Sequence, residues 1–243
     1  MIALVRYQLS LLARSHRWVP AAVIYVIGVA GLGGVGGAAT PHGQALTQGL
    51  SWSALMLVPA VAWLTRSALT AEPPAARAVV AAATGPRRAQ LAALGAAFGF
   101  AVPFGLAGMI WEIVSCGLVR SPLTNAVQVG ATASAIGRGL GAGLICLLVG
   151  SAIGALCNPP VIRRPAGSML TSTAAVVLAL VWSISPANAA VRVWSPSATG
   201  QAAGAGAHAA AHTWPPGLPV LSALALLAVA WGISALVAAR RSG

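Results

Sequence analysis

Charge is almost missing from this chain. Of its 243 residues only 7% are charged, whereas a soluble domain has about 25%. Acidic residues are the scarcest, since Glu72 and Glu112 are the only two. With 58% apolar residues and a mean hydropathy of +0.86, this composition excludes an ordinary soluble domain and predicts an integral membrane protein.

Lysine is absent, and all 14 basic residues are arginine. A Walker A phosphate loop requires a lysine, so this chain cannot hydrolyse ATP through such a loop by itself. The serines of the apolar runs have no His and Asp partners near them, so the sequence gives no support to nucleophilic catalysis. We therefore expect a protein that is not an enzyme.

Cysteine and metal-ligand patterns are also poor. Cys116, Cys146 and Cys157 form no CxxC pair, and we expect them to be small buried residues without a disulfide framework. His208 and His212 lie four residues apart, but no carboxylate or cysteine is near enough in sequence to complete a metal site. The sequence predicts no metal and no cofactor.

The chain is instead rich in long apolar runs. A helix needs about 20 apolar residues to cross a bilayer, and six runs approach that length. We expect membrane spans near residues 18–39, 50–70, 91–114, 137–157, 168–187 and 217–238. The first could instead be a signal peptide cleaved near 37–39, but its apolar run is long for that role and a charged lead of 17 residues precedes it.

The arginines lie at the ends of these runs, and they predict the topology. This placement fits the positive-inside rule better than nucleic-acid binding, despite a net charge of +12. With the N-terminus in the cytoplasm, eleven arginines lie inside and only Arg120, Arg138 and Arg192 lie outside. Six spans then place both termini in the cytoplasm.

Residues 1–17 predict an amphipathic helix before the first span. The apolar side of a helical wheel carries Ile2, Val5, Leu9, Leu12 and His16, and the polar side carries Arg6, Ser10, Arg14 and Arg17. Because the apolar positions recur at intervals of three and four residues, we expect this helix to lie along the cytoplasmic membrane surface.

Residues 66–90 form the longest expected cytoplasmic connection. They hold four arginines and Glu72, one of the two acids. Pro73 and Pro74 precede a helix-prone stretch that ends at Gly85, followed by Pro86. We expect a short cytoplasmic helix here, although composition alone favours a plain basic loop that sets the topology.

Three stretches resemble the small six-span permease subunits of ATP-binding cassette exporters. They read "LVRYQLSLLARSHRWVPAAVIY", "RSALTAEPPAARAVVAAATGPRRAQLAAL" and "GALCNPPVIRRPAGSML". The resemblance implies an all-α type-2 exporter fold, in which an interfacial N-terminal helix precedes six transmembrane helices. It also implies that a coupling helix in the 66–90 connection docks on a separate ATPase subunit. Glu72, Arg77, Arg87 and Arg88 lie where contacts with that subunit are expected.

The resemblance further implies a single transmembrane permease domain over residues 1–243 in the plasma membrane. Six spans are half a transporter, so the chain would dimerise with itself or with a sister permease. The expected substrate is hydrophobic or amphipathic, because the spans are poor in charge.

The alternatives are a non-transporting anchoring, assembly or sensor subunit and, with less support, a secondary transporter. The family places short helices outside, between the fifth and sixth spans, whereas residues 197–212 predict a flexible segment there.

Two charged residues fall inside expected spans. Glu112 and Arg138 both lie near the outer ends of their helices, and a charge at membrane depth suggests a function. One interpretation is that they pair and line an outer gate or vestibule. The alternative is that both side chains extend independently to the headgroups.

Glycines in the fourth span predict close helix packing. Gly137, Gly141, Gly150 and Gly154 recur at helical spacing, and residues this small allow two helix backbones to approach.

Overall fold

The computed structural model describes residues 2–35, 42–118, 126–157, 161–162, 165–182, 185–194 and 217–240. In these ranges all regular structure is helical. The helices are α1 (Ile2–Arg14), α2 (Val19–Val35), α3 (His42–Leu69), α4 (Pro74–Thr84), α5 (Pro86–Glu112), the π-helix η1 (Ile113–Leu118), α6 (Ala126–Leu156), α7 (Pro165–Val181), α8 (Pro186–Trp194) and α10 (Leu218–Arg240).

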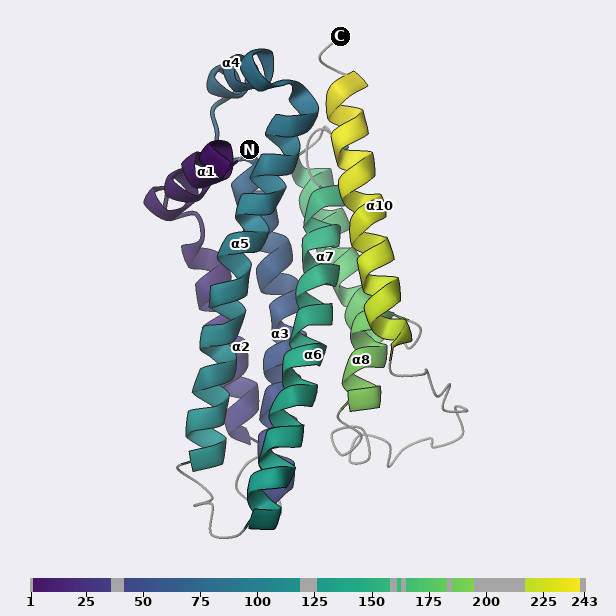
Figure 1. Ribbon diagram of the computed structural model, residues 1–243. Helices are drawn as coiled ribbons and strands as arrows, with labels where there is room; N and C mark the ends of the chain where they lie inside the picture. The colour runs from purple at the N-terminus through teal and green to yellow at the C-terminus, as the bar shows by residue number, and fades with distance from the viewer. Residues whose placement is uncertain are drawn as a thin grey trace.

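The long helices form one bundle, and α1 and α4 lie across one end of it (Figure 1). The end of α10 lies at that same end, so the two ends of the chain are on one side. Among the described residues, five helical stretches are long and apolar enough to cross a membrane: Leu46–Leu69, Pro86–Ser115, Thr132–Leu156, Gly167–Val191 and Leu218–Arg240. The all-α prediction is confirmed, and the structure fits a multi-pass membrane protein.

The first predicted span is the one that differs in length. Its helix, α2, has 17 residues and is apolar throughout, but it is shorter than the other five stretches. It runs beside α3 in the bundle (Figure 1). Residues 36–39 of this predicted span lie outside the described residues.

The fifth predicted span, 168–187, is not one continuous helix. α7 ends at Val181, and α8 begins at Pro186. Proline has no N–H to continue the ladder and disfavours a helical residue before it, which accounts for the break. The Asn188 amide donates a hydrogen bond of 2.7 Å to the carbonyl oxygen of Leu180 and so satisfies one carbonyl at the end of α7.

The centre of the bundle is α3, which packs against α2, α5 and α6. Two of the predicted glycines explain its close contact with α6. A Cβ at Gly150 would lie 2.8 Å from the carbonyl oxygen of Val58, and one at Gly154 would lie 2.8 Å from that of Ala62. The prediction is wrong for Gly137, whose Cβ position faces open space.

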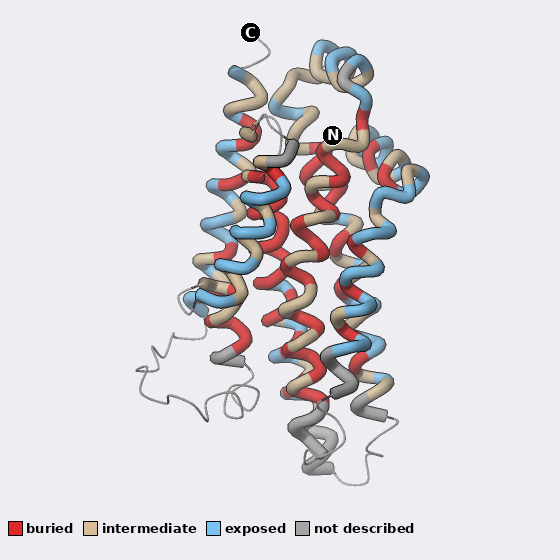
Figure 2. The backbone as a smooth tube through the Cα atoms, turned by 180° about the vertical axis from the view of Figure 1, so that it is seen from behind, coloured by how far each residue is buried: buried red, intermediate tan, exposed pale blue. Residues whose placement is uncertain are grey.

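Exposed segments run along the flanks of the bundle (Figure 2), and many of their side chains are apolar. Large apolar side chains are exposed on α2, α5, α7 and α10; examples are Ile27, Ile110, Leu170, Val181, Leu221 and Val229. A soluble monomer rarely exposes so many large apolar side chains, whereas lipid chains can cover them at no cost.

The predicted helix at the N-terminus is present as α1. Within the protein Leu12 and the polar Gln8 are buried, whereas Ile2 is 87% exposed. α1 packs on α5, and this contact sets the face that is buried. His16 has a φ of 50° and turns the chain from α1 into α2.

Candidate functional site

The corner that joins α3, α4 and α5 holds the charged residues that the sequence singled out. The predicted short helix is present as α4. Pro73 and Pro74 begin it, because a proline in the first turn loses no helical hydrogen bond. Gly85 ends it with a φ of 88°, a conformation that favours glycine, and its N–H donates to the carbonyl oxygen of Ala81.

Two arginines from different elements satisfy the end of α3. The Arg77 guanidinium, on α4, donates to the carbonyl oxygen of Leu69 and, at 3.3 Å, to that of Glu72. The Arg17 guanidinium, between α1 and α2, donates to the carbonyl oxygen of Thr70 at 2.6 Å. The last turn of a helix presents free carbonyls and a partial negative charge, so both cations stabilise it. They also tie α1 and α4 to the same point of the bundle.

Glu72 lies inside this corner. Its side chain is only 8% exposed, and its Oε1 atom is buried without a hydrogen-bond partner among the described residues. A buried carboxylate oxygen without a partner is unfavourable. The structure therefore leaves an unsatisfied acceptor in the segment where the sequence predicts a contact with another subunit.

Arg87 and Arg88 lie in the first turn of α5, and both are exposed. A helix N-terminus carries a partial positive charge, so two cations there gain nothing from the helix itself. Their position is better explained by anionic headgroups or by an acidic partner.

The outward face of α4 is apolar. Ala75, Ala78, Val79 and Ala82 are exposed, and Val79 is 69% exposed. Their spacing of three and four residues places them on one side of the helix. In the described part of the chain, α4 packs on α5, and no other element covers this side.

Glu112 and Arg138 differ in their surroundings. Glu112 is 3% exposed and is followed directly by η1, a π-helix of the kind often found at functional sites. Arg138 is exposed, and its guanidinium hydrogen bonds go to the carbonyl oxygen and hydroxyl of Ser134 on its own helix, at 3.3 and 3.4 Å. No ion pair joins the two among the described contacts, and the outer-gate role stays a prediction.

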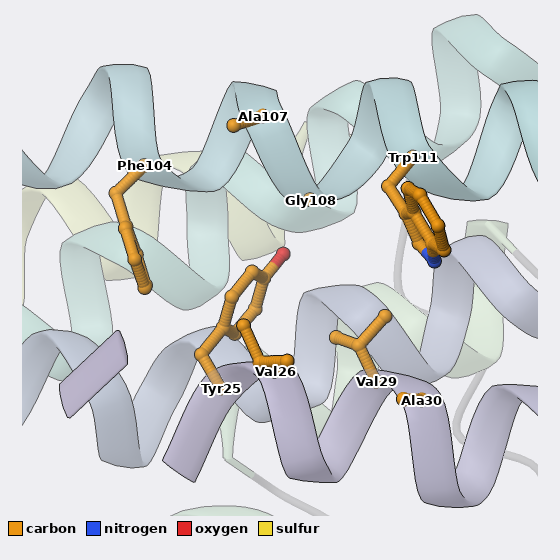
Figure 3. Close-up of a pocket in the computed structure, with 8 residues that line it drawn as sticks. All are labelled: Tyr25, Val26, Val29, Ala30, Phe104, Ala107, Gly108 and Trp111. Carbon is orange, nitrogen blue, oxygen red and sulfur yellow. The ribbon is translucent and has the colours of Figure 1, made fainter. Parts of the chain in front are cut away.

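A groove between α2 and α5 is a feature that the sequence analysis missed (Figure 3). Its volume is about 320 Å³. One wall carries Tyr25, Val26, Val29 and Ala30 of α2. The other wall carries Phe104, Ala107, Gly108 and Trp111 of α5.

The Tyr25 side chain shapes this groove. Its ring packs on that of Phe104, with centroids 5.0 Å apart, and its hydroxyl lies 2.7 Å from that of Ser53 on α3, within hydrogen-bond distance. Gly108 is required beside it, because a Cβ there would overlap the Tyr25 ring and hydroxyl. The ring faces the groove while its one polar atom is already paired.

Cys157 follows directly after the last residue of α6. Its side chain is buried, and burial raises the pKa of the thiol; a hydrogen bond from Thr171 and the charge of Arg66 oppose this shift without reversing it. Cys157 is therefore a poor nucleophile at neutral pH.

Several predicted residues lie outside the described residues, and the structure does not bear on them. These are His208, His212, Arg120, Arg163, Arg164, Arg241 and the segment 197–212. The side chains of Cys116 and Arg192 are likewise not described. Across the described ranges, no group of three or more His, Cys, Asp or Glu residues is placed to hold a metal ion.

Comparison of the chain with protein-family models, with curated proteins and with solved structures found no match.

Proposed function

We propose that this chain is the permease subunit of an ATP-binding cassette exporter and that α4 docks on a separate ATPase subunit. The observation that carries the proposal is the apolar face of α4. It lies at the end of the bundle that holds α1 and the end of α10, and no described element covers it. A short amphipathic helix with one apolar face is a common docking element for a groove on a partner.

The anchoring of α4 supports a role in transmitting movement. Arg77 ties α4 to the end of α3, the central helix of the bundle. α4 continues through Gly85 alone into α5, so a push on α4 acts on two long helices. A flexible basic loop would not transmit such a push.

The charges around α4 favour a partner with acidic groups. Arg87 and Arg88 are exposed and offer contacts to such groups, whereas Glu72 is buried within this chain. A contact between Glu72 and a basic residue of the partner stays a prediction. Charge complementarity of this kind sets orientation and specificity more than affinity. Because the chain has no lysine for a Walker A loop, the partner would supply ATP hydrolysis.

The expected substrate is hydrophobic or amphipathic. The described helices carry few charges and present mostly apolar faces, which suits such a molecule better than an ion or a sugar. A transporter of this class needs two permease halves, so we include dimerisation with a second copy or a sister permease in the proposal. A non-transporting anchoring subunit is the alternative, and it predicts binding without substrate-dependent ATP turnover.

The test changes the α4 face without touching its anchor. The chain would be co-expressed with a Walker-containing ATPase from a neighbouring reading frame, where one is encoded, and co-purification and ATP turnover in nanodiscs would be measured. Val79→Asp should weaken co-purification at least tenfold, because a charge on a buried apolar contact typically costs more than about 1.4 kcal/mol. Ala13→Asp, an exposed position of α1 at the same end of the bundle, is the matched control.

Two outcomes would contradict the proposal. If Val79→Asp binds the ATPase as well as the wild-type chain does, α4 is not the docking element. If no neighbouring frame encodes an ATPase and none co-purifies, the exporter assignment fails. Retained binding with substrate-independent turnover would favour the anchoring subunit.

A further inference from the structure

The groove between α2 and α5 is long and narrow. From Phe104 to Trp111 it follows seven residues of α5, or about 10 Å at 1.5 Å per residue. A volume of about 320 Å³ over that length leaves a mean cross-section of about 30 Å². A helix 10 Å in diameter has a cross-section of about 80 Å². A helix from a second copy can therefore cover the groove but cannot enter it, whereas a single extended chain can.

The walls of the groove select a hydrocarbon. No charged residue lines it. The Tyr25 hydroxyl is already paired with that of Ser53, so the inner part of the groove offers no free polar group. A polar ligand would lose its hydrogen bonds to water without replacing them, and an apolar chain loses nothing.

The mouth of the groove faces the outer side of the bundle. Val26, Ala30, Ala107 and Trp111 border it, and all four are exposed. They belong to the apolar surface that lipid would cover in a membrane-spanning chain. A hydrocarbon chain of the bilayer can enter sideways, without leaving the membrane.

Trp111 gives the groove a polar end. It lies four residues before the end of the apolar stretch Pro86–Ser115, where tryptophan commonly marks the membrane interface. Its indole is 62% exposed, and its nitrogen points across the mouth toward α2 (Figure 3). This N–H can donate to an ester or phosphate oxygen while the ring stays in the apolar layer.

We infer that this groove binds one phospholipid from the bilayer leaflet at the Trp111 end of α5. One acyl chain lies between Tyr25 and Phe104 at its inner end, and the polar part of the lipid meets the Trp111 N–H at its mouth. The site is independent of the proposed transport function, because it requires only that α2 and α5 face the bilayer.

The experiment counts retained lipid by native mass spectrometry of the full chain. The probe is dioleoyl phosphatidylcholine in nanodiscs, followed by extraction into detergent and a delipidating wash. A zwitterionic lipid is needed because a net charge of +12 would hold anionic lipid on the arginines without any groove.

Two substitutions fill the groove from opposite walls. Ala30→Phe and Ala107→Phe both start from exposed alanines, so the backbone can accept them. Each should lower the retained phosphatidylcholine at least fivefold. Ala225→Phe, at an exposed alanine of α10 outside the groove, should retain as much as the wild-type chain. Trp111→Phe keeps the ring and removes the donor, and it should lower retention by a smaller factor.

Three results would overturn the inference. The first is equal retention by the two filling variants and the wild-type chain. The second is an equal loss with Ala225→Phe, which would show unspecific binding to the apolar surface. The third is a change of oligomeric mass in the filling variants with lipid retention unchanged, which would make the groove a contact between copies.

Discussion

At the scale of single residues, Gly108 is the position where the structure leaves least space. Gly108→Ala places a Cβ inside the volume of the Tyr25 ring, which packs on Phe104 and is paired with Ser53. We expect this substitution to lower the free energy of unfolding by about 1–3 kcal/mol, the usual cost of overpacking. Thermal unfolding in detergent would measure it.

Gly99 provides the matched control for that change. It lies on the same helix, and a Cβ there meets nothing within 4 Å. Gly99→Ala should therefore stabilise the protein, by up to about 1 kcal/mol, because alanine favours a helix more than glycine does. Equal effects of the two substitutions would contradict the packing of Tyr25 on α5.

We predict that Arg77 stabilises the protein through its hydrogen bonds to the end of α3 and not through its charge alone. Arg77→Met removes the donors to the carbonyl oxygens of Leu69 and Glu72. We expect the free energy of unfolding to fall by about 1 kcal/mol, less than the net 1.5–3 kcal/mol typical of a hydrogen bond to a charged group, because Arg77 is only partly buried. Limited proteolysis at α4 would report it, with the exposed Arg88→Met as control. Equal cleavage of both variants would show that the cap does not hold α4.

The residue scale is also where sequence reasoning was weakest. It did not anticipate that the guanidinium of Arg77 donates to the end of α3, and the partner contact of Arg77 stays a prediction. It also did not anticipate that the Glu72 side chain is only 8% exposed. Neither outcome was visible in the sequence, because both depend on the angle at which α4 leaves α3. The Tyr25–Ser53 contact joins residues 28 apart and left no local signal.

At the scale of helices, α4 and the end of α6 should differ sharply in accessibility. Single-cysteine variants would carry either Val79→Cys or the native Cys157. Val79 is 69% exposed, so its replacement should react with maleimide quickly at pH 7.5. Burial raises the pKa of Cys157, so less thiolate is present at neutral pH and its labelling should be slow.

The pH dependence has a definite sign. Raising the pH toward and past the elevated pKa of Cys157 increases its thiolate fraction, so its labelling rate should keep rising above pH 9. The Val79→Cys rate should level off earlier, since an exposed thiol has an ordinary pKa. Fast labelling of Cys157 at pH 7.5 would contradict the burial of its side chain.

If the proposed ATPase binds α4, adding it should slow only the Val79→Cys reaction.

Helix existence was predictable, and helix ends were less so. An apolar run shows only the part of a helix that is apolar enough to lie in a membrane. The predicted spans at 50–70 and 137–157 therefore missed the earlier turns of α3 and α6, which begin at His42 and Ala126. Those turns carry small and polar residues that continue the helix without an apolar pattern. The break between α7 and α8 had a signal in Pro186, but the apolar composition on both sides concealed it.

At the scale of the whole molecule, the arrangement of elements agrees with the arginine pattern. α1, α4 and the end of α10 lie together at one end (Figure 1). The described segments at this end carry Arg6, Arg14, Arg17, Arg66, Arg77, Arg87, Arg88 and Arg240. A single basic end is the arrangement that the positive-inside rule expects of a cytoplasmic face.

The number of membrane passes depends on α2. At 17 residues it is about 25 Å long, against a hydrocarbon core of about 30 Å. A mismatch of about 5 Å can be met by local thinning of the bilayer at modest cost. Because α1 and α4 lie at the same end of the bundle, α2 has to run its full length before α3 returns. We therefore predict that α2 crosses the membrane and that the chain makes six passes.

Reporter fusions and tag accessibility would test this topology. A tag on the N-terminus and fusions at Gly85 and at the C-terminus should read cytoplasmic, while fusions at Thr40 and Gly204, both outside the described residues, should read external. The comparison that decides the number of passes is the N-terminus against Thr40, since only α2 separates them. Opposite sides mean that α2 crosses and that the other five stretches bring the C-terminus back to the side of the N-terminus. If both read external while Gly85 reads cytoplasmic, α2 lies along the outer surface, α1 cannot share an end of the bundle with α4, and the six-pass fold is wrong.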